Sequence, residues 1–366
     1  MRADLNVPLD GTTITDDSRI RAALPTIRYL RERSARVVVC SHLGRPKGRV
    51  VPELSLRPVA ERMEELLGEP VAFAGEDGPL RLLENLRFDP REEQNDPALA
   101  AELAALADVY VNDAFGAAHR AHASTEAVAH LLPCAAGLLL EAELNAFARL
   151  LDAPAHPFVV VLGGVKVADK IGVIDRLSQL ADSILIGGAM TFTFLAAQGL
   201  DVGDSRHEDE EGQGIARRAM DDSAQRGCEL VLPTDVVVAD RFAAEAAVRT
   251  VAVDAIPDGW MGLDIGPATA RDYGRRLAAA RTVFWNGPMG VFELEPFAHG
   301  TLAVAKAVAA SDAVSVVGGG DSVAAVNAAG VADQITHVST GGGAALELVE
   351  GRVLPGVAAL EQSAPV

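Results

Sequence analysis

Two lysines stand four residues apart in the segment Phe158 to Gly172, which reads FVVVLGGVKVADKIG. Lys166 and Lys170 are half of the four lysines among 32 lysine and arginine residues, so the other 28 are arginines. A lysine ammonium group is a compact, mobile point charge, which suits a phosphoryl group in transfer. A solvated helix face is the alternative explanation of such a pair. Because the chain otherwise uses arginine, we favour phosphoryl-transfer chemistry here.

Arginine and histidine side chains follow short apolar segments in the first half of the chain. They are Arg19 at a predicted helix start, His42 with Arg45 after Val37 to Cys40, Arg87 in a predicted strand from Leu82 to Phe88, and His119 with Arg120 after a strand that begins at Val109. Such groups at strand ends and helix starts bind phosphate or carboxylate. We therefore predict a basic patch for a small polyanion.

His119 and His122 have a spacing that could place both rings on one helix face, as in some metal sites. No third ligand pattern accompanies them, and Arg120 between them would oppose a cation. An anion site is more consistent with these residues.

Strand-like segments of the second half end in glycines instead of arginines. They are Ile184 to Gly188 (ILIGG), Val283 to Pro288 (VFWNGP), Val314 to Asp321 (VSVVGGGD) and His337 to Gly343 (HVSTGGG). Glycine at a strand end that leads into a helix lets backbone N–H groups approach a phosphate. Asp321 is placed to hold a metal ion that bridges phosphates. These features predict a cradle for a metal-bound nucleotide.

The elements that must position these residues can be read from apolar spacing. Phe158 to Leu162 predicts a strand buried on both faces, followed by a segment that could open a helix with both lysines on one face. Further predictions are helices in Ser18 to Arg33, Val59 to Leu67 and Glu141 to Leu151, loop and helix in Pro90 to Leu106, a strand pair in Leu230 to Ala239, and a surface loop from Arg206 to Gly214. A tail from Glu347 is apolar enough to pack.

Length and composition set the broad class. With 366 residues and 49% hydrophobic content the chain is expected to form two domains. No apolar run reaches the length of a membrane span, and no signal-peptide pattern begins the sequence. Cys40, Cys134 and Cys228 lie far apart and are expected to be buried thiols in a reducing cytosol. A net charge of −19 argues against nucleic acid as a partner.

Two familiar nucleotide signatures are missing from the sequence. No G-x-x-x-x-G-K-[ST] occurs, so the chain is not a P-loop protein, and no strict G-x-G-x-x-G occurs, which weakens a dinucleotide-dependent oxidoreductase. Two alternatives remain open beside a kinase: that oxidoreductase, and a nucleotide-binding protein without kinase activity, which would bind ATP without turnover.

The chain resembles the phosphoglycerate kinase family over nearly its whole length. The motifs that carry the resemblance occur in the family's order: DLNVP, SHLGRP, LENLRF, DAFGAAHRAHAS, LGGVKVADKIGVI, IGGAMTFTFL, LPTDVVVA, GLDIGP, FWNGPMGVFE, VGGGDS and STGGGAALELVEG. The resemblance implies an α/β protein of two Rossmann-like domains, each a mostly parallel sheet flanked by helices, joined by a helical hinge. Val165, where the family usually has Ala, and Ser322, where Thr is usual, are small departures that we expect to be tolerated.

The implied activity is reversible transfer of a phosphoryl group from the acyl phosphate of 1,3-bisphosphoglycerate to MgADP, giving ATP and 3-phosphoglycerate in glycolysis. The enzyme would be a phosphotransferase with a carboxyl group as acceptor, and transfer would be direct and in line on domain closure, with no covalent enzyme intermediate. The implied partners are these substrates and Mg²⁺, with no nucleic acid and no membrane. We expect a cytoplasmic monomer.

The resemblance also implies a role for individual residues. Asp4, Asn6, Arg19, His42, Arg45, Arg87 and Arg120 would hold 3-phosphoglycerate or its bisphosphate. Lys166 and Arg19 would stabilise the transferring group, with Gly320 and the backbone N–H groups of Gly342 and Gly343 at the transfer site. Lys170 would contact nucleotide phosphate, and the adenine site would be lined by Gly187, Gly188 and Gly262. Two further residues would lie at the nucleotide, Asn286 and Glu293, with Glu293 at its ribose. The phosphate would be cradled by Gly319, Gly320, Asp321 and Ser322, and Asp321 would also hold Mg²⁺.

The expected domain organisation follows the same resemblance. We expect a domain for 3-phosphoglycerate at 1–140, an interdomain helix and linker at 141–155 about which the domains close, a nucleotide-binding domain at 156–345, and a segment at 346–366 that packs back towards the first domain. Family members carry a helix and the first part of a strand before DLNVP. Here only MRA precedes that motif, so we expect the first strand to be truncated.

Overall fold

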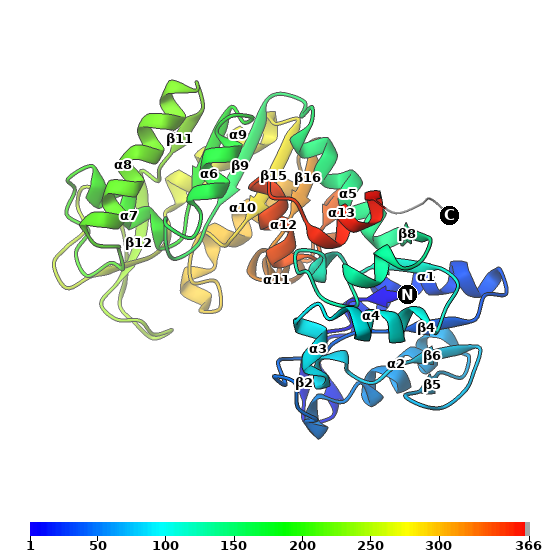
Figure 1. Cartoon of the computed structure of the whole chain (residues 1–366). Coiled ribbons are helices and arrows are strands. Elements are labelled where there is room, and N and C mark those ends of the chain that lie inside the picture. The colour runs from blue at the N-terminus through cyan, green and yellow to red at the C-terminus, as the bar shows by residue number, and fades with distance from the viewer. Residues whose placement is uncertain (363–366) are drawn as a thin grey trace. The chain divides into compact units, whose positions relative to one another are not determined.

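The computed structural model describes residues 1–362. They form two compact units, which Figure 1 shows with the chain coloured from its N-terminus. Unit 1 comprises Met1–Asn145 and the described residues from Arg352 on, and unit 2 comprises Ala146–Gly351. The last four residues of the expected C-terminal segment, 363–366, lie outside the described part of the chain.

Parallel strands form the centre of unit 1. Its strands are β1 (Arg2–Ala3), β2 (Leu9–Asp10), β3 (Thr13–Ile14), β4 (Val37–Val39), β5 (Ala72–Phe73), β6 (Leu80–Leu82), β7 (Tyr110–Asp113) and β8 (Cys134–Ala136). Strands β1, β7 and β8 pair in parallel, as do β4, β6 and β5, and a parallel bridge between Arg2 and Cys40 joins the two sets. Strands β2 and β3 form a separate antiparallel hairpin.

The longer helices of unit 1, such as α1 (Ser18–Glu32) and α2 (Arg57–Leu67), bury an apolar face. The others are α3 (Pro90–Glu93), α4 (Pro97–Ala104) and α13 (Pro355–Gln362), with α5 (Leu138–Leu151) continuing into unit 2. Ile20, Leu24 and Ile27 of α1 recur at helical spacing and are buried in the same core as Val37 and Val39 of β4. The 3₁₀ turns η1 (Pro52–Leu54), η2 (Leu86–Phe88), η3 (Phe115–Ala117) and η4 (Ala127–His130) connect these elements.

A six-stranded parallel sheet forms the centre of unit 2. Its strand order is β11 (Glu229–Val231), β10 (Ser183–Ile186), β9 (Phe158–Leu162), β15 (Thr282–Asn286), β16 (Val314–Val317) and β17 (His337–Val338). Every residue of β9 is buried, as the sequence predicted for a strand covered on both faces. Since parallel strands end at the same edge of a sheet, Gly163, Gly187, Gly287 and Gly318 meet at one edge.

Helices cover both faces of this sheet. They are α6 (Ile171–Leu177), α7 (Met190–Ala197), α8 (Glu210–Gln225), α9 (Pro267–Ala279), α10 (His299–Ala309), α11 (Gly320–Ala328) and α12 (Gly342–Val349), with the 3₁₀ turns η5 (Glu295–Phe297) and η6 (Ala332–Gln334). Val159 and Val161 pack in one core with residues of α9, α10 and α11. On the other face, Phe284 of β15 meets Phe147 of α5 with ring centroids 6.4 Å apart.

A small antiparallel sheet adjoins the parallel one within unit 2. It has the order β13 (Val248–Ala252), β12 (Asp235–Ala239) and β14 (Met261–Ile265). Its core contains Phe192 and Leu195 of α7 together with Val236 and Val238. The sheet therefore packs against α7, the helix that follows the glycine end of β10.

Most predicted elements are confirmed, including the helices near Ser18, Val59 and Glu141 and the α/β class with parallel sheets. Leu230 to Ala239 contains two strands, but the prediction that they form a pair is wrong, because β11 joins β10 in the parallel sheet and β12 lies between β13 and β14 in the antiparallel one. The three cysteines are free and buried. Within residues 1–362 we find no helix with the length and apolar character that a membrane crossing requires.

Two local predictions are wrong because side-chain caps decide the local structure there. Strand β6 ends at Leu82, and Arg87 lies in η2, where the Asn85 side chain accepts the N–H of Arg87 at 3.1 Å. The loop expected from Arg206 to Gly214 is half helix, because α8 begins at Glu210. Asp209 caps it by accepting the N–H of Gly212 at 3.2 Å, and two glutamates in its first turn favour the helix N-terminus.

Candidate functional site

In unit 1, the first predicted site residues are joined by an ion pair. Arg19 is the second residue of α1, and its Nη1 donates to Oδ2 of Asp4 at 2.6 Å. Asp4 is 6% exposed and Arg19 35% exposed. The carboxylate thus holds one of the five guanidinium N–H groups and leaves the others for a ligand.

Gly44 links two further predicted residues. Its N–H donates to Oδ1 of Asn6 at 2.8 Å, and its carbonyl accepts a hydrogen bond from Nη1 of Arg87 at 2.9 Å. Its φ of +61° is in the left-handed region, and a Cβ here would lie 2.8 Å from Cδ2 of Leu54. Glycine is therefore required where the SHLGRP segment turns.

Positive charge surrounds the buried ring of His42. Burial lowers its pKa well below the usual value, and the charges of Arg2, Arg87, Arg120 and Arg19 lower it further. Burial also lowers the pKa of Arg87, with the charge of Arg120 as the next cause. His42 is therefore neutral near pH 7, and the surrounding arginine charge favours an anion.

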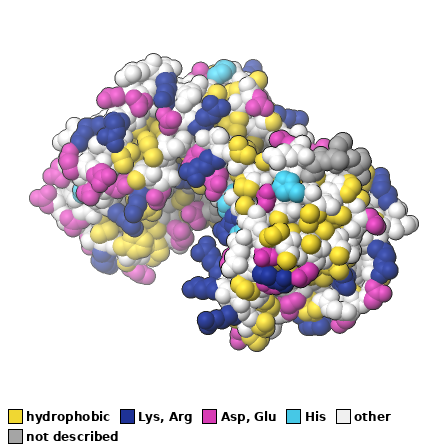
Figure 2. All heavy atoms as spheres, in the orientation of Figure 1, with side chains coloured by type: hydrophobic (Ala, Val, Ile, Leu, Met, Phe, Trp, Pro, Cys, Tyr) yellow, Lys and Arg dark blue, Asp and Glu magenta, His cyan; other side chains and the backbone are white. Residues whose placement is uncertain are grey.

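The remaining basic residues border the same region. Arg120 donates from Nε to Nε2 of His119 at 3.1 Å. Burial and the charges of Arg87 and Arg120 lower the pKa of His122 to about 4. Arg45 follows Gly44, and its side chain is exposed. Figure 2 shows Lys and Arg side chains gathered along one edge of unit 1.

In unit 2, the two lysines stand on an irregular turn after β9. Lys170 is the N-cap of α6, which begins at Ile171, and Lys166 lies exposed in the turn before it. The prediction that both lysines share a helix face is wrong, because the chain leaves the strand through Gly164 at a φ of +143° and completes a turn before the helix starts. The N–H of Val167 donates to Oε2 of Glu208 at 2.6 Å, which fastens the turn.

Asn286, at the end of β15, holds the second lysine. Nζ of Lys170 donates to Oδ1 of Asn286, and Nδ2 of Asn286 donates to the carbonyl of Gly318 at 2.7 Å. Burial lowers the pKa of Lys170, whereas the charges of Asp169, Asp321 and Glu350 raise it. The ammonium group is thus fixed next to the glycine end of β16.

Helix α11 begins at this edge and contains three predicted residues. Gly319 is its N-cap with φ +94°, and a Cβ there would lie 2.7 Å from Nδ2 of Asn286. The first backbone N–H groups of a helix have no acceptor within it, so they are available to a phosphate. Ser322 is buried, and its Oγ accepts the N–H of Gly287 at 2.6 Å. Its hydroxyl therefore already has a structural partner.

Helix α12 starts after the next glycine run. Gly342 is its first residue with φ +30°, and Gly343 is the exposed second residue. These two helix starts place Gly320 and Gly343 at N-termini that follow β16 and β17.

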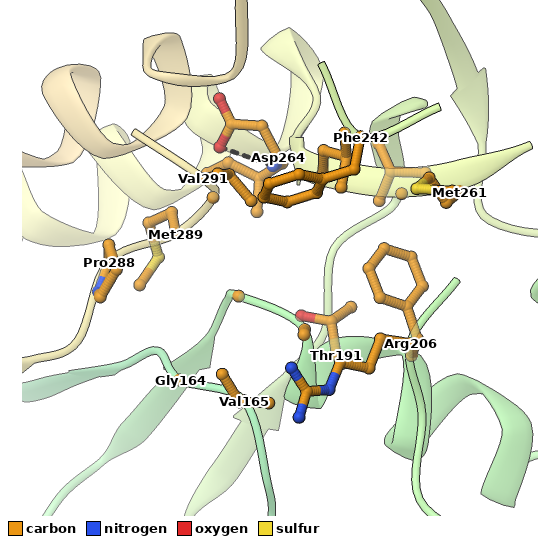
Figure 3. A pocket seen from close by; sticks show the side chains of 18 of the residues that line it. Gly164, Val165, Thr191, Arg206, Phe242, Met261, Asp264, Pro288, Met289 and Val291 are labelled. Atoms are coloured by element: carbon orange, nitrogen blue, oxygen red, sulfur yellow. Dashed lines mark hydrogen bonds between the residues drawn. The ribbon is translucent and has the colours of Figure 1, made fainter. Parts of the chain in front are cut away.

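A cavity of about 390 Å³ lies between the parallel sheet edge and the small antiparallel sheet. Figure 3 shows Met261, Asp264 and Val291 on one wall and Thr191 and Arg206 on the opposite one. Of the predicted nucleotide residues, those that line the cavity are Gly188, Gly262, Glu293 and Asp321. Gly187 is buried against Met289, where a Cβ would lie 2.4 Å from its sulfur, and does not line the cavity.

Gly262 allows close packing of an aromatic ring in this wall. A Cβ at Gly262 would lie 1.9 Å from Cζ and 2.4 Å from Cε1 of Phe192. Its N–H donates to Oγ of Ser205 at 2.9 Å, so the strand is fixed on this side. The ring of Phe192 can therefore lie directly on β14.

Several lining residues were not identified from the sequence: Thr191, Arg206, Phe242 and Asp264. Phe242 is 62% exposed on the loop after β12, and an exposed aromatic in the polar segment DRFAAE was the available signal. The Thr191 hydroxyl is buried and has no hydrogen-bond partner among residues 1–362. Most buried polar groups have a hydrogen-bond partner, so this hydroxyl is an unusual feature of the cavity wall.

Asp264 is a buried carboxyl group in the same wall. It accepts the N–H of Gly300 at 2.7 Å and that of Ile265 at 2.9 Å. Burial nevertheless raises its pKa to about 7. Nothing in the sequence distinguished this aspartate from an exposed one.

The residues present fit a Mg²⁺ ion that arrives with a nucleotide. In the part of the chain that the structure describes, no group of three or more His, Cys, Asp or Glu side chains could hold a metal by itself. Mg²⁺ is usually held by one or two carboxylates together with water and substrate phosphates. Asp321 is an exposed carboxylate in the first turn of α11 and lines the cavity, so it suits this arrangement.

Comparison with known proteins covers the whole site. The family model "Phosphoglycerate kinase" matches residues 1–352. The chain is 56% identical to the phosphoglycerate kinase of Moorella thermoacetica, over 99% of this chain and 95% of that protein, and 58% identical to that of Chloroflexus aurantiacus, over 99% and 96%. It is similar to the solved phosphoglycerate kinase structure from Coxiella burnetii, with a TM-score of 0.91 and 42% sequence identity over 99% of this chain and 95% of that one. It is also similar to the structure from Pyrococcus horikoshii, with a TM-score of 0.84 and 33% identity over 98% of this chain and 95% of that one.

Proposed function

The chain belongs to the phosphoglycerate kinase family, and from that premise we propose how its two units share the reaction. The enzyme is a glycolytic kinase that transfers a phosphoryl group reversibly between 1,3-bisphosphoglycerate and ADP. The family generally uses the magnesium complex of the nucleotide. The residues that bind each substrate are the proposal.

Unit 1 binds the phosphoglycerate. Arg19, held by Asp4, and Arg87, held by the Gly44 carbonyl, offer oriented N–H groups. Asn6 supports the same turn, and Arg45 and Arg120 add charge at its border. This concentration of positive charge on a protein of net charge −19 supports a site for a small anion.

Unit 2 binds the nucleotide, and the observation that carries this assignment is its cavity. The apolar wall with Gly188, Gly262 and Phe192 suits the base, and Glu293 suits the ribose. The cavity extends to Asp321 at the start of α11, where helix N–H groups and Lys170 would take the phosphates and Asp321 would hold Mg²⁺. Three predicted residues do not line the cavity and would instead hold the sheet edge behind it in place: Gly187, Gly319 and Ser322.

Transfer itself requires charge neutralisation and positioning more than covalent chemistry. Lys166 is exposed and therefore free to follow the phosphoryl group as it moves, which Lys170, tied to Asn286, is not. Arg19 and the backbone N–H groups at Gly320 and Gly343 would stabilise the same charge. Direct transfer requires the two bound substrates to meet, and no residue acts as a nucleophile.

The enzyme is proposed to act as a cytoplasmic monomer. The three buried free thiols suit a reducing compartment. Light scattering of the purified chain tests the oligomeric state, and a dimer mass would contradict this part of the proposal.

The test is a coupled assay with ATP, Mg²⁺ and 3-phosphoglycerate. We expect Lys166→Ala to lower kcat strongly, whereas Lys306→Ala, which removes an exposed lysine of α10, serves as the matched control and leaves kcat unchanged. Calorimetry should show that Arg19→Ala weakens 3-phosphoglycerate binding but not ATP binding, and that Lys170→Ala does the reverse. Equal loss of both ligands in either variant would refute the division of labour between the units.

A further inference from the structure

A fully buried arginine stands behind the proposed phosphoglycerate site. Arg2 is 0% exposed, and each of its guanidinium nitrogens has a partner. Nε donates to Oγ of Ser124 at 3.0 Å, Nη1 donates to the carbonyl of Ala3 and to Oγ of Ser41 at 3.3 Å, and Nη2 lies 2.9 Å from Nδ1 of His42. The orientation of this guanidinium is therefore fixed from several sides.

A buried carboxylate anchors the same arginine through a hydroxyl group. Glu92 is 0% exposed, and its Oε1 accepts from Oγ of Ser124 at 2.6 Å while its Oε2 accepts the N–H of Ser124 at 3.0 Å. Ser124 Oγ in turn accepts from Arg2. A line of hydrogen bonds thus runs from Glu92 through Ser124 and Arg2 to His42.

The chemistry of the two end groups settles the direction of the last bond. A guanidinium has five N–H donors, no acceptor, and does not lose its proton in proteins. Nδ1 of His42 must therefore be the acceptor at 2.9 Å. A neutral imidazole that accepts at Nδ1 carries its proton on Nε2. Protonation of Nδ1 would turn two N–H groups towards each other, so the same contact opposes the imidazolium.

We propose that Arg2 is a positioning residue that keeps His42 neutral and in its Nε2–H form, so that the ring donates a hydrogen bond to an anionic oxygen of the bound phosphoglycerate. The identity of that ligand rests on the proposed function. Arg2 is the one hydrogen-bond partner of the His42 ring among residues 1–362, which leaves Nε2 for the substrate. The charges that face the ring, Arg2, Arg19, Arg87 and Arg120, all oppose a second proton.

The first experiment is spectroscopic and needs no ligand. The full chain is labelled with ¹⁵N-histidine, and long-range ¹H–¹⁵N correlations are recorded at about pH 7. The His42 signals are assigned by their loss in His42→Gln. We expect the pattern of a neutral ring protonated at Nε2. A ring protonated at Nδ1, or at both nitrogens, would overturn the proposal. Because no substrate is present, this result is independent of whether unit 1 binds phosphoglycerate.

The second experiment uses a matched pair of variants that keep a long side chain. Arg2→Met removes the donor, so we expect His42 to take up its second proton at a higher pH than in the wild type. We also expect KM for 3-phosphoglycerate to rise by about threefold to tenfold, the loss of one hydrogen bond, with KM for ATP unchanged. Arg2→Lys retains a donor without an acceptor and should restore both values in large part. Equal effects of the two substitutions on the titration would refute the role of Arg2.

Substitutions of His42 decide the question if Arg2→Met does not fold. Gln places its amide nitrogen near the position of Nε2, whereas Asn places its amide nitrogen near that of Nδ1. We expect His42→Gln to keep KM for 3-phosphoglycerate closer to the wild-type value than His42→Asn. The opposite order would overturn the proposal.

Discussion

A single methyl group added at Gly262 should close the proposed base site from within its own wall. The Cβ of Gly262→Ala would lie 1.9 Å from Cζ of Phe192 and 2.4 Å from Cε1. Ordinary carbon contacts lie at about 3.5–4.0 Å, so the ring must move by roughly 1.5 to 2 Å. Phe192 is 3% exposed and lines the cavity, so the cavity is the space into which it can move.

The cost can be set from this geometry. Overpacking of a closely packed site typically costs about 1–3 kcal/mol. If most of it falls on the nucleotide complex, ATP affinity should decrease by roughly tenfold, since about 1.4 kcal/mol corresponds to a factor of ten. Affinity for 3-phosphoglycerate should be unchanged, because its proposed site is in unit 1.

Titration calorimetry of ATP and of 3-phosphoglycerate against the purified Gly262→Ala variant measures both affinities. Gly274→Ala is the control, because that glycine lies in α9 and a Cβ there meets only Cβ of Ala307 at 3.9 Å. The double variant Gly262→Ala, Phe192→Leu removes the ring atoms that clash and should recover part of the lost affinity. Unchanged ATP affinity in Gly262→Ala, or no recovery in the double variant, would show that this wall does not bind the base.

Three further predictions concern groups described above. Burial raises the pKa of Asp264 to about 7. Between about pH 4 and pH 7 the carboxyl group is therefore ionised in the unfolded chain but protonated in the native one. The free energy of unfolding should fall by an amount on the order of 4 kcal/mol as pH rises through this range. Asp264→Asn should flatten that part of the pH profile in urea unfolding followed by tryptophan fluorescence, which reports unit 2 because Trp260 and Trp285 both lie there; an equally steep profile would argue against a buried protonated carboxyl. Gly44→Ala should raise KM for 3-phosphoglycerate and leave KM for ATP unchanged, because a left-handed residue with a Cβ costs about 1–2 kcal/mol and strains the contacts to Asn6 and Arg87; a normal KM would mean that this turn does not shape the site. Ser322→Ala should destabilise unit 2 by about 1–3 kcal/mol, because the N–H of Gly287 loses its acceptor, whereas Ser322→Thr keeps the hydroxyl and should lose less in the same unfolding assay.

The sequence predicted elements whose signal lies in consecutive residues. The five apolar residues Phe158 to Leu162 correspond to β9 because a central parallel strand buries both faces and needs no alternation. The helix in Ser18 to Arg33 was equally clear, since its apolar residues recur at helical spacing. Such patterns report the local geometry of a strand or helix, so they can be recognised without knowing the contacts made by the rest of the chain.

The start of α8 had a local signal in Asp209, Glu210 and Glu211, but other features that the sequence did not predict depend on contacts with distant residues. Asn85 turns the chain after β6 because its amide also donates to the carbonyls of Leu43 and Leu54, which no local pattern announces. The cavity wall takes Arg206 and Phe242 from two loops that meet only in the fold. Arg2 likewise gains its role from Ser124 and His42, which come from other segments of unit 1.

At the ends of β9, β10 and β15, backbone atoms of neighbouring turns fill the space that a side chain at Gly163, Gly188 or Gly287 would need. A Cβ at Gly163 would lie 1.9 Å from the carbonyl oxygen of Pro288, one at Gly287 would lie 2.2 Å from that of Gly163, and one at Gly188 would lie 2.6 Å from the nitrogen of Gly164. A side chain in the way can rotate aside, but these backbone atoms belong to turns that hydrogen bonds hold at the sheet edge, such as Gly163 N–H to the Asn286 carbonyl at 3.0 Å and Gly188 N–H to the Met289 carbonyl at 2.8 Å. In a selection experiment with random libraries, substitutions at these three positions should therefore find no second-site suppressors among neighbouring side chains. This corner of the enzyme should be closed to stepwise evolutionary change, while the loops with Arg206 and Phe242 remain free to vary and to tune which nucleotide is accepted.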